Sequence, residues 1–491
     1  MLARLLRIVC GVMIGALLLA TTLAAQQPAK KSAKGIDGIW EGTLKAGIQN
    51  LRLAFKITRN DDGSLAATLD SIDQGAKDLK FDTVTFKDGD LHLRMKAIQG
   101  TFDAKLSADG AELVGTWKQG GATFPLQLKR VEKATVLKRP QDPKKPFPYA
   151  EEDVTYENKA AGITIAGTLT LPKSAGPHPC VLLICGSGPH TRDEPLMGHK
   201  PFLVLADYLT RHGIAVLRVD KRGCGKSGGK YAEATSVDFA DDVLAGVDYL
   251  KNRKEINPKQ IGLIGHSEGG LIAPMAAARS KDVAFIVLLA GPGLTGEEIL
   301  VMQGQLLLRA MGASDKTLAS QKSLQQRLFA IMREEKDNAA AEKKALAIFA
   351  EEFAKLSDAE KKQAEAMKES AGMQAKILFT PWFRFFLTYD PRDALRKVQC
   401  PVLALNGEKD LQVPPKEDLP EIEKALKAAG NKDFTIKEFP KLNHLFQTCK
   451  IGSVAEYGQI EETMAPIVLE TIANWIAKHA QPMPAPADKA K

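Results

Sequence analysis

Residues 259–270 of this chain read Lys259-Gln260-Ile261-Gly262-Leu263-Ile264-Gly265-His266-Ser267-Glu268-Gly269-Gly270. The apolar run at the start predicts a buried strand, and the small apolar residues after it predict a helix packed closely on a sheet. Where such a strand turns directly into a helix, the pattern Gly265-x-Ser267-x-Gly269 permits a sharp bend that lifts the serine hydroxyl above the sheet. We therefore predict that Ser267 is a nucleophile. A Gly/Ser-rich turn without a catalytic role is the alternative.

Strand-like and helix-like patterns alternate on both sides of this segment. The predicted elements are a hairpin over Asp153–Glu157 and Ile163–Pro172, strands Cys180–Ile184, Ile214–Val219 and Ala284–Leu289, and helices Pro201–His212 and Val237–Lys251. Such alternation predicts a mostly parallel, doubly wound sheet with helices on both faces, spanning residues 150–480. In these sheets the chemistry takes place at the carboxyl ends of the strands.

About a hundred residues without a strand pattern interrupt this alternation, from 294 to 397. Four spans rich in Ala, Glu, Lys and Leu predict amphipathic helices over Glu297–Met311, Leu318–Lys336, Ala339–Leu356 and Asp358–Glu369. The strands resume at Pro401–Asn406, so we interpret the insertion as a lid over the site. Its aromatic end includes Trp382, which either belongs to the core or lines an apolar substrate pocket.

Two loops at strand ends are candidates for contacts with the reacting group. Cys185-Gly186-Ser187-Gly188-Pro189-His190 exposes backbone N–H groups, and we expect the N–H of Ser187, together with that of Glu268, to bind an oxyanion. A structural turn is the alternative. Gly186, His190 and His266 are further candidates for substrate contact.

Asp220-Lys221-Arg222-Gly223-Cys224-Gly225-Lys226-Ser227-Gly228 is the second glycine-rich loop, and it follows strand Ile214–Val219. It lacks the spacing of a phosphate-binding loop. We interpret it as part of the loop architecture near the site, with Asp220 and Arg222 paired structurally rather than catalytic.

A serine nucleophile needs a histidine base and a carboxylate that orients the imidazole. In hydrolases with this strand-turn-helix motif, the order along the chain is serine, acid, histidine. Asp410 follows the strand that ends at Asn406, and we prefer it to Glu408 and Asp418 as the acid. For the base we prefer His444, which follows the last predicted strand, to His479 at the end of the last helix.

The N-terminal part, residues 35–132, has an all-β pattern. Alternating segments separated by Asp-Gly turns cover Trp40–Leu44, Leu51–Ile57, Leu65–Leu69, Val84–Phe86, Leu91–Met95, Phe102–Leu106 and Leu113–Trp117. They predict a small meander barrel or a sandwich, and Gly38-x-Trp40-x-Gly42 resembles the start of lipocalin-like barrels. We expect an accessory domain, joined by the Pro-rich linker 133–149.

The chain opens with a basic stretch, an apolar run from Ile8 to Leu19 and a small-residue exit that ends at Ala25. This pattern is typical of a secretory signal peptide over residues 1–25, with an uncleaved membrane anchor as the alternative. We expect an exported protein, periplasmic or secreted, without a membrane span after cleavage. Residues 481–491 are expected to form a disordered tail.

Composition excludes few classes of protein. The 491 residues carry a formal net charge of +8, but the lysines are spread among Glu and Asp, which predicts a solvated surface and no nucleic-acid partner. Five cysteines follow the predicted signal peptide, so at least one thiol is unpaired within the chain. Their spacing does not match a zinc site.

Several motifs together resemble the α/β-hydrolase superfamily. They are Gly-His-Ser-Glu-Gly-Gly at 265–270, Gly-Ser-Gly-Pro at 186–189, Asp-x-Arg-Gly-x-Gly-x-Ser at 220–227 and Gly-Glu-Lys-Asp at 407–410, with Asn-His at 443–444. The chain is most similar to exported bacterial esterases and to the dienelactone-hydrolase and serine-aminopeptidase-like branches. The resemblance implies no metal and no organic cofactor. Many relatives carry histidine where this chain has Cys185.

These observations predict an exported serine hydrolase that cleaves small carboxylic esters through Ser267, His444 and Asp410 and an acyl-enzyme. A serine peptidase of the aminopeptidase or dipeptidyl-peptidase type is the first alternative. It would need a carboxylate in the insertion to bind a substrate ammonium, for which Glu297 or Glu298 are candidates. A non-catalytic ligand-binding protein is the second alternative. The oligomeric state is left open by the sequence.

Overall fold

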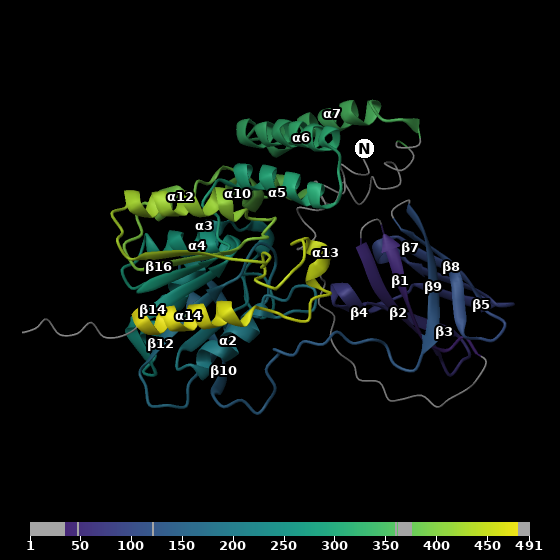
Figure 1. Cartoon of the computed structure of the whole chain (residues 1–491), viewed down its shortest axis with the longest axis horizontal. Coiled ribbons are helices and arrows are strands. Elements are labelled where there is room, and N and C mark those ends of the chain that lie inside the picture. Colours follow the sequence, from purple (N-terminus) through teal and green to yellow (C-terminus); the bar gives the residue numbers. More distant parts are fainter. Residues whose placement is uncertain (1–34, 47–48, 120–121, 359–360, 362–375, 480–491) are drawn as a thin grey trace, which may run out of the picture.

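The structure is a computed structural model that describes residues 35–46, 49–119, 122–358, 361 and 376–479. The predicted signal peptide 1–25, the predicted tail 481–491 and most of the helix expected over Asp358–Glu369 lie outside these residues. Figure 1 shows two parts side by side: an antiparallel sheet formed by the first part of the chain, and a larger part in which helices cover a second sheet.

The first part is one antiparallel sheet of nine strands in the order β4-β3-β2-β1-β9-β8-β7-β6-β5. The strands are β1 (Gly38–Ala46), β2 (Gln49–Arg59), β3 (Leu65–Ser71), β4 (Ala76–Lys80), β5 (Thr83–Lys87), β6 (Asp90–Met95), β7 (Gly100–Leu106), β8 (Glu112–Gln119) and β9 (Ala122–Val131). The segments expected from the sequence all fall within these strands, because side chains at alternate positions enter one core.

This sheet curls around its core. The Phe55 ring lies at the centre, 5.1 Å from the ring of Phe102 and 6.0 Å from that of Trp117. The two edge strands, β4 and β5, are joined by Phe81 and Asp82 alone, so the two ends of the sheet approach each other. Phe81 extends the β3–β4 ladder by donating its backbone N–H to the carbonyl oxygen of Ala67 at 3.0 Å. A single curled sheet favours the barrel-like alternative over a sandwich of two sheets.

The larger part is built on eight strands in the order β10-β11-β13-β12-β14-β15-β16-β17. They are β10 (Ala150–Asn158), β11 (Ile163–Leu171), β12 (His178–Ile184), β13 (Ala215–Val219), β14 (Ile256–His266), β15 (Phe285–Leu289), β16 (Val402–Gly407) and β17 (Phe434–Phe439). β10 and β11 form the predicted hairpin, and all strands from β13 onward in this order are parallel. The predicted fold, a mostly parallel sheet preceded by a small all-β domain, is therefore confirmed.

Helices cover both faces of this sheet. The helices are α2 (Pro201–Arg211), α3 (Ser236–Lys251), α4 (Glu268–Ala277), α12 (Pro415–Ala428) and α14 (Pro466–His479). One apolar core joins α3, α4 and α12 to one face, and a second joins α2 and α14 to the other. The central strands are buried on both faces, which explains why their sequences are continuous apolar runs rather than alternating ones.

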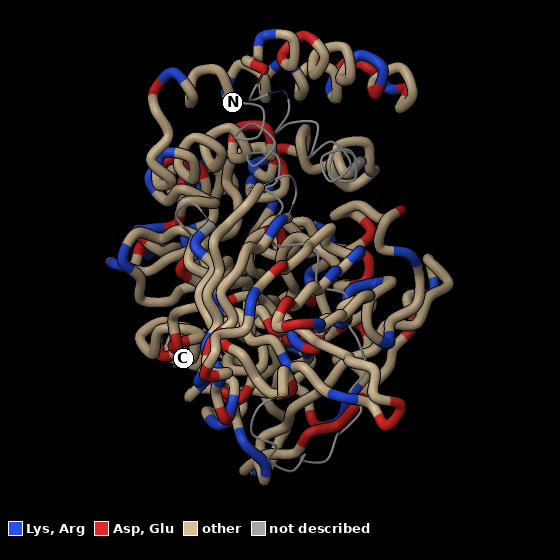
Figure 2. Tube along the Cα trace, turned by 90° about the vertical axis from the view of Figure 1, so that its right-hand side faces the viewer, with Lys and Arg blue, Asp and Glu red and all other residues tan. Residues whose placement is uncertain are grey.

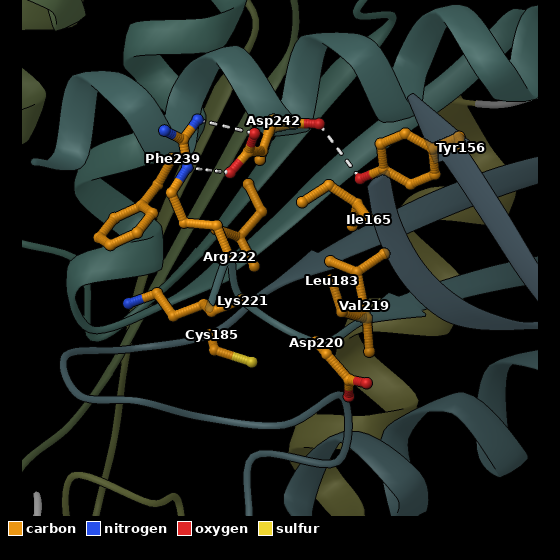
Figure 3. A pocket seen from close by; sticks show the side chains of 12 residues that line it. Tyr156, Ile165, Leu183, Cys185, Val219, Asp220, Lys221, Arg222, Phe239 and Asp242 are labelled. Carbon is orange, nitrogen blue, oxygen red and sulfur yellow. Dashed lines mark hydrogen bonds and ion pairs between the residues drawn. The ribbon is translucent and has the colours of Figure 1, made fainter. Parts of the chain in front are cut away.

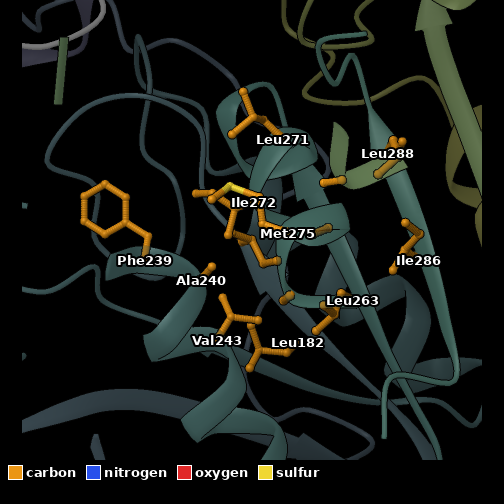
Figure 4. Packing of buried hydrophobic residues seen from close by; sticks show 14 of the residues in the cluster. Leu182, Phe239, Ala240, Val243, Leu263, Leu271, Ile272, Met275, Ile286 and Leu288 are labelled. Atoms are coloured by element: carbon orange, nitrogen blue, oxygen red, sulfur yellow. The ribbon is translucent and has the colours of Figure 1, made fainter. Parts of the chain in front are cut away.

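α4 packs unusually close to the sheet. Figure 4 shows Ile272 and Met275 of this helix among apolar side chains from the strands and from α3. A Cβ atom at Gly269 would lie 2.0 Å from the carbonyl oxygen of Ile184, so only glycine allows the first turn of α4 to approach β12. The short connection between β14 and α4 therefore lies directly over the carboxyl ends of the strands.

The helical insertion leaves the sheet after β15 and returns at β16. Its described elements are α5 (Gly296–Ala310), α6 (Asp315–Glu334), α7 (Asn338–Ala354), η4 (Lys376–Phe379), α10 (Pro381–Thr388) and α11 (Arg392–Leu395). Phe383 and Phe386 of α10 belong to the same core as α4, so the end of the insertion is anchored to that face of the sheet. None of the helices in the described ranges combines the length and apolarity that crossing a bilayer requires.

The linker is anchored to the larger part. Arg139 donates hydrogen bonds to the carbonyl oxygens of Met197, Gly198, Gly458 and Ile460 at 2.9–3.2 Å.

The charges of both signs are interspersed along the chain (Figure 2). All five cysteines of the described residues are free thiols, so the disulfide that the sequence left open is not formed among them.

Candidate active site

Ser267 occupies a strained backbone position between β14 and α4. Its φ of 53° and ψ of −119° lie outside the regions that residues with a Cβ atom normally adopt. Two glycines make this bend possible: a Cβ at Gly265 would lie 1.9 Å from the carbonyl oxygen of Gly269, and a Cβ at Gly269 would clash with β12. The bend places Ser267 at the N-terminus of α4, where the helix dipole stabilises negative charge.

Asp410 and His444 come together across the loops that follow β16 and β17. His444 Nδ1 lies 2.7 Å from Asp410 Oδ2, and both side chains are buried. Asp410 Oδ1 accepts hydrogen bonds from the backbone N–H groups of Gln412 and Val413, at 2.7 and 2.9 Å, which orients the carboxylate. With Nδ1 bound to the carboxylate, the imidazole leaves Nε2 to act as a base.

His266, directly before Ser267, links the nucleophile candidate to His444. His266 Nε2 lies 3.1 Å from the backbone carbonyl oxygen of His444, and the two rings are 4.9 Å apart. The structure therefore brings Ser267, His444 and Asp410 to one end of the sheet. Within the described residues Ser267 Oγ and His444 Nε2 do not form a hydrogen bond, and such bonds commonly tighten only when substrate is bound.

The alternatives considered for acid and base lie elsewhere. Glu408 accepts the backbone N–H of Lys441 at the surface. Asp418 lies buried in α12, where its Oδ1 accepts the N–H of Gly293 at 2.6 Å. His479 stacks on Trp475 at the end of α14. Within the described residues, none of these three side chains forms a hydrogen bond or an ion pair with His444 or Ser267.

A polar cluster that sequence reasoning missed supports the loop of His444. Asn443 Oδ1 accepts the backbone N–H groups of Leu445 and Gln447 at 3.0 Å each. The Gln447 amide in turn contacts the ring of His199 at 3.0 Å and the carbonyl oxygen of Glu462 at 3.0 Å. The Asn-His pair in the sequence was a signal for this turn, but the two distant partners gave none.

The Gly186–Ser187 segment lies against the nucleophile candidate. A Cβ at Gly186 would be 3.2 Å from the Cβ of Ser267. The N–H of Gly186 is donated to Glu194 Oε1 at 2.5 Å, whereas the N–H of Ser187 has no acceptor among the described residues. The N–H of Glu268, at the first turn of α4, has no intrahelical acceptor because of its position. These two N–H groups are therefore both available to a ligand oxygen.

Two buried histidines flank these groups in different states of charge. Both ring nitrogens of His266 face acceptors, Glu194 Oε1 at 3.1 Å and the His444 carbonyl, and both bonds form only if the ring is protonated. Burial lowers the pKa of His266, but the Glu194 carboxylate outweighs it and the net pKa is raised. The pKa of His190, whose Nε2 lies 2.8 Å from the Ser187 carbonyl oxygen, is lowered by burial.

Glu268 presents its buried carboxylate to three donors. Lys221 Nζ lies 3.0 Å from Oε2, while Ser236 Oγ and Trp382 Nε1 each lie 2.7 Å from Oε1. Trp382 also stacks on Phe386 at 5.4 Å. The indole N–H thus binds the strand-to-helix bend of residues 265–269, called the elbow below, and its ring packs within α10. This contact joins the insertion to the site.

Asp220 and Arg222 do not pair with each other, contrary to our interpretation of the sequence. Asp220 binds Arg192 at 2.8 Å, and Arg222 binds Asp242 of α3 at 2.7 Å. Figure 3 shows Arg222 and Asp242 at the edge of a cavity between α3 and the ends of β12 and β13. The cavity has a volume of about 30 Å³, room for a water molecule. Asp220 also accepts the backbone N–H groups of Arg192 and Lys226 at 2.8 and 3.0 Å, so we interpret both ion pairs as structural contacts that hold the loop.

Known proteins of two kinds are similar to this chain in sequence. A family model described as "Serine aminopeptidase, S33" matches residues 200–448. Esterase EstD of Thermotoga maritima is 28% identical over 341 residues, which is 68% of this chain and 69% of that protein. An uncharacterised 31.7 kDa protein of Escherichia coli is 26% identical over 257 residues, 52% of this chain and 80% of its own length.

Solved structures were also found to be similar. Est1E from Butyrivibrio proteoclasticus, solved with ferulic acid bound, aligns with a TM-score of 0.38 and 18% identity over 66% of this chain and 98% of its own. The Pyrococcus furiosus esterase Pf2001 aligns with a TM-score of 0.40 and 17% identity over 71% of this chain and 98% of its own.

The family model covers half of the chain, including the elbow and both loops that carry Asp410 and His444. The matched residues include the parallel strands β13 to β17 and the strand-to-helix bend at Ser267. The protein is therefore a hydrolase, and the chain belongs to the serine aminopeptidase S33 family of the α/β-hydrolase superfamily.

Proposed function

We propose that this protein is a serine hydrolase that cleaves carboxylic esters through an acyl-enzyme. His444, oriented by Asp410, removes the proton of Ser267 as the serine oxygen attacks the ester carbonyl. The backbone N–H groups of Ser187 and Glu268 stabilise the tetrahedral oxyanion. The intermediate collapses as the bond to the alcohol breaks, the alcohol leaves with the proton from His444, and the acyl group stays on Ser267. Water then attacks this acyl-enzyme with His444 as base, and the acid leaves as the proton returns to the serine oxygen.

One observation carries this proposal. Ser267 is held at φ 53° on the elbow, and the residue before it binds the backbone of the histidine whose Nδ1 is bound by Asp410. A serine in a routine turn would have no reason to occupy a strained backbone position beside a buried imidazole and carboxylate. The similarity to EstD adds support for esters as the substrate class.

The peptidase alternative draws support from the description of the family. It requires a carboxylate that can bind a substrate ammonium. Of the candidates in the insertion, Glu297 forms an ion pair with Arg333 at 2.8 Å. Glu298 accepts the backbone N–H of Thr295 at the start of α5 and lies 3.3 Å from the guanidinium of Arg392. Because each carboxylate already has a cation, we favour esters over aminopeptidase substrates.

The test is turnover of p-nitrophenyl esters and amino-acid p-nitroanilides by the wild type and by Ser267→Ala. We expect ester hydrolysis to dominate in the wild type and kcat to fall by about 10³-fold or more in the variant, with unchanged folding. Ser174→Ala, at an exposed serine of the same domain, is the matched control and should keep wild-type turnover. Ester turnover retained by Ser267→Ala would contradict the proposal, whereas preferred cleavage of anilides would favour the peptidase.

We further propose that residues 1–25 direct export and are cleaved, and that the insertion acts as a lid. The basic, apolar and small-residue regions in that order support the first proposal. The bond between Trp382 and Glu268 supports the second. N-terminal sequencing of the protein from the periplasm or the medium tests export: the mature chain should begin at Ala25 or Gln26, and an intact Met1 in the membrane fraction would contradict it.

A further inference from the structure

Lys221 is a buried lysine for which the proposed mechanism has no role. It follows β13 in the Asp220–Gly228 loop, and only 7% of its surface is exposed. Its ammonium group makes two polar contacts: Glu268 Oε2 at 3.0 Å and the carbonyl oxygen of Gly186 at 2.8 Å. The ammonium also lies 4.3 Å from the centre of the Phe239 ring, and Figure 3 shows the side chain between Phe239 and Cys185.

The carbonyl that Lys221 binds belongs to the same peptide unit as the N–H of Ser187. This peptide bond is trans, since the cis bonds of the described chain lie elsewhere. In a planar trans peptide the C=O and N–H groups point in opposite directions. An ammonium that fixes the Gly186 carbonyl on one side therefore fixes the Ser187 N–H on the other, next to Ser267.

The other contact of Lys221 reaches the second donor of the proposed oxyanion hole. Glu268 contributes its backbone N–H to that hole and its side chain to Lys221. The Gly186 N–H is held in addition by Glu194 Oε1 at 2.5 Å, so the peptide units on both sides of Gly186 have charged partners. The Lys221 ammonium thus connects the Gly186–Ser187 segment with Glu268, and each of these segments supplies one donor.

The charge on Lys221 strengthens this arrangement. A cation bound to a carbonyl oxygen polarises the peptide and makes its N–H a better donor. Burial lowers the pKa of Lys221, but the Glu268 carboxylate and its hydrogen bond more than compensate, so the net pKa is raised and the group stays charged. The pair is almost completely buried, and a buried ion pair of this kind contributes little stability by itself because desolvating the two charges is costly.

We propose that Lys221 is a positioning residue for catalysis, which aligns the Ser187 N–H with the Glu268 N–H so that both face the oxyanion of the transition state. This inference rests on the proposed function, because it needs Ser267 as the nucleophile. The carbonyl of the bound ester carries little charge, whereas the tetrahedral intermediate carries a full one. Loss of Lys221 should therefore lower kcat and leave KM nearly unchanged.

The test compares Lys221→Met/Glu268→Gln with the wild type. Replacing both partners avoids a buried unpaired charge, which a single substitution would create. Ester hydrolysis should show kcat lowered by about 10- to 100-fold with KM within about 2-fold, because the donor is misaligned rather than deleted. The affinity for a trifluoromethyl ketone, which forms a charged tetrahedral adduct with the serine, should fall by the same factor as kcat.

Two further variants complete the design. Lys226→Met removes an exposed lysine from the same loop, and it should keep wild-type kcat and ketone affinity. Lys221→Met alone serves if the double variant does not fold, as judged by its thermal transition, because the Glu268 carboxylate keeps the hydrogen bonds donated by Ser236 and Trp382. We expect it to show a several-fold loss of kcat and ketone affinity at constant KM. A folded double variant with wild-type kcat, or with reduced kcat but unchanged ketone affinity, would overturn the inference. Ester turnover by Ser267→Ala would instead overturn the proposed function itself.

Discussion

His199 should make this protein less stable in acid. Its Nδ1 lies 2.9 Å from Thr463 Oγ1 and its Nε2 lies 2.9 Å from the carbonyl oxygen of Tyr457, beneath the loop of His444. Burial, with a smaller contribution from the charge of Arg139, lowers the pKa of His199 to about 4. The unfolded chain binds this proton near pH 6.5 and the folded chain only near pH 4, so the free energy of unfolding falls as the pH drops through this window.

The size of the effect follows from the two pKa values. Between pH 7.5 and 4.5 the linkage removes about 2.5 kcal/mol from the free energy of unfolding, at about 1.4 kcal/mol per pH unit in the steep part. Urea titrations followed by circular dichroism at the two pH values measure it. His199→Gln should lose about 2.5 kcal/mol less than the wild type over this range, whatever its stability at pH 7.5.

The matched control for this prediction is His212→Gln, at an exposed histidine that ends α2. It should show the same pH dependence as the wild type. The reasoning would be refuted if His199→Gln and the wild type lost equal free energy between the two pH values, because His199 would then be protonated in the folded state as readily as in the unfolded one.

Two further changes test the buried carboxyl of α12 and the elbow. Burial raises the pKa of Asp418 well above its usual value, so the contribution of this carboxyl to stability decreases as the pH rises above about 4. The thermal transition of Asp418→Asn should therefore gain on that of the wild type between pH 5 and 8, and a constant difference would contradict this. Gly269→Ala places a Cβ 2.0 Å from a backbone oxygen and should cost roughly 1–3 kcal/mol of stability and most of the activity, whereas Gly228→Ala, with neighbours no closer than 3.5 Å, should be close to neutral in thermal melting and in ester turnover.

Much of the fold could be predicted because its signals are local. The buried strands are short apolar runs, and the strand-to-helix bend needs small residues at Gly265 and Gly269. The strands of the N-terminal sheet could be predicted because apolar and polar residues alternate along them and Asp-Gly turns separate them. The expected pairing of Asp220 with Arg222 was wrong, because closeness in the sequence does not show which charged groups a folded loop brings into contact. Asp220 binds Arg192 and Arg222 binds Asp242 instead.

The sequence by itself determined the class of fold and the candidates for nucleophile, acid and base, since strand ends, glycine spacing and chain order are all properties of the linear chain. Only the tertiary structure decided which charges surround them. Glu194 meets His266, Lys221 meets Glu268, and Gln447 meets His199, and none of these pairs is close in the chain. The physical reason is that a buried charge or amide is costly unless it is hydrogen-bonded, and its partner must be a group that the tertiary fold places within about 3 Å.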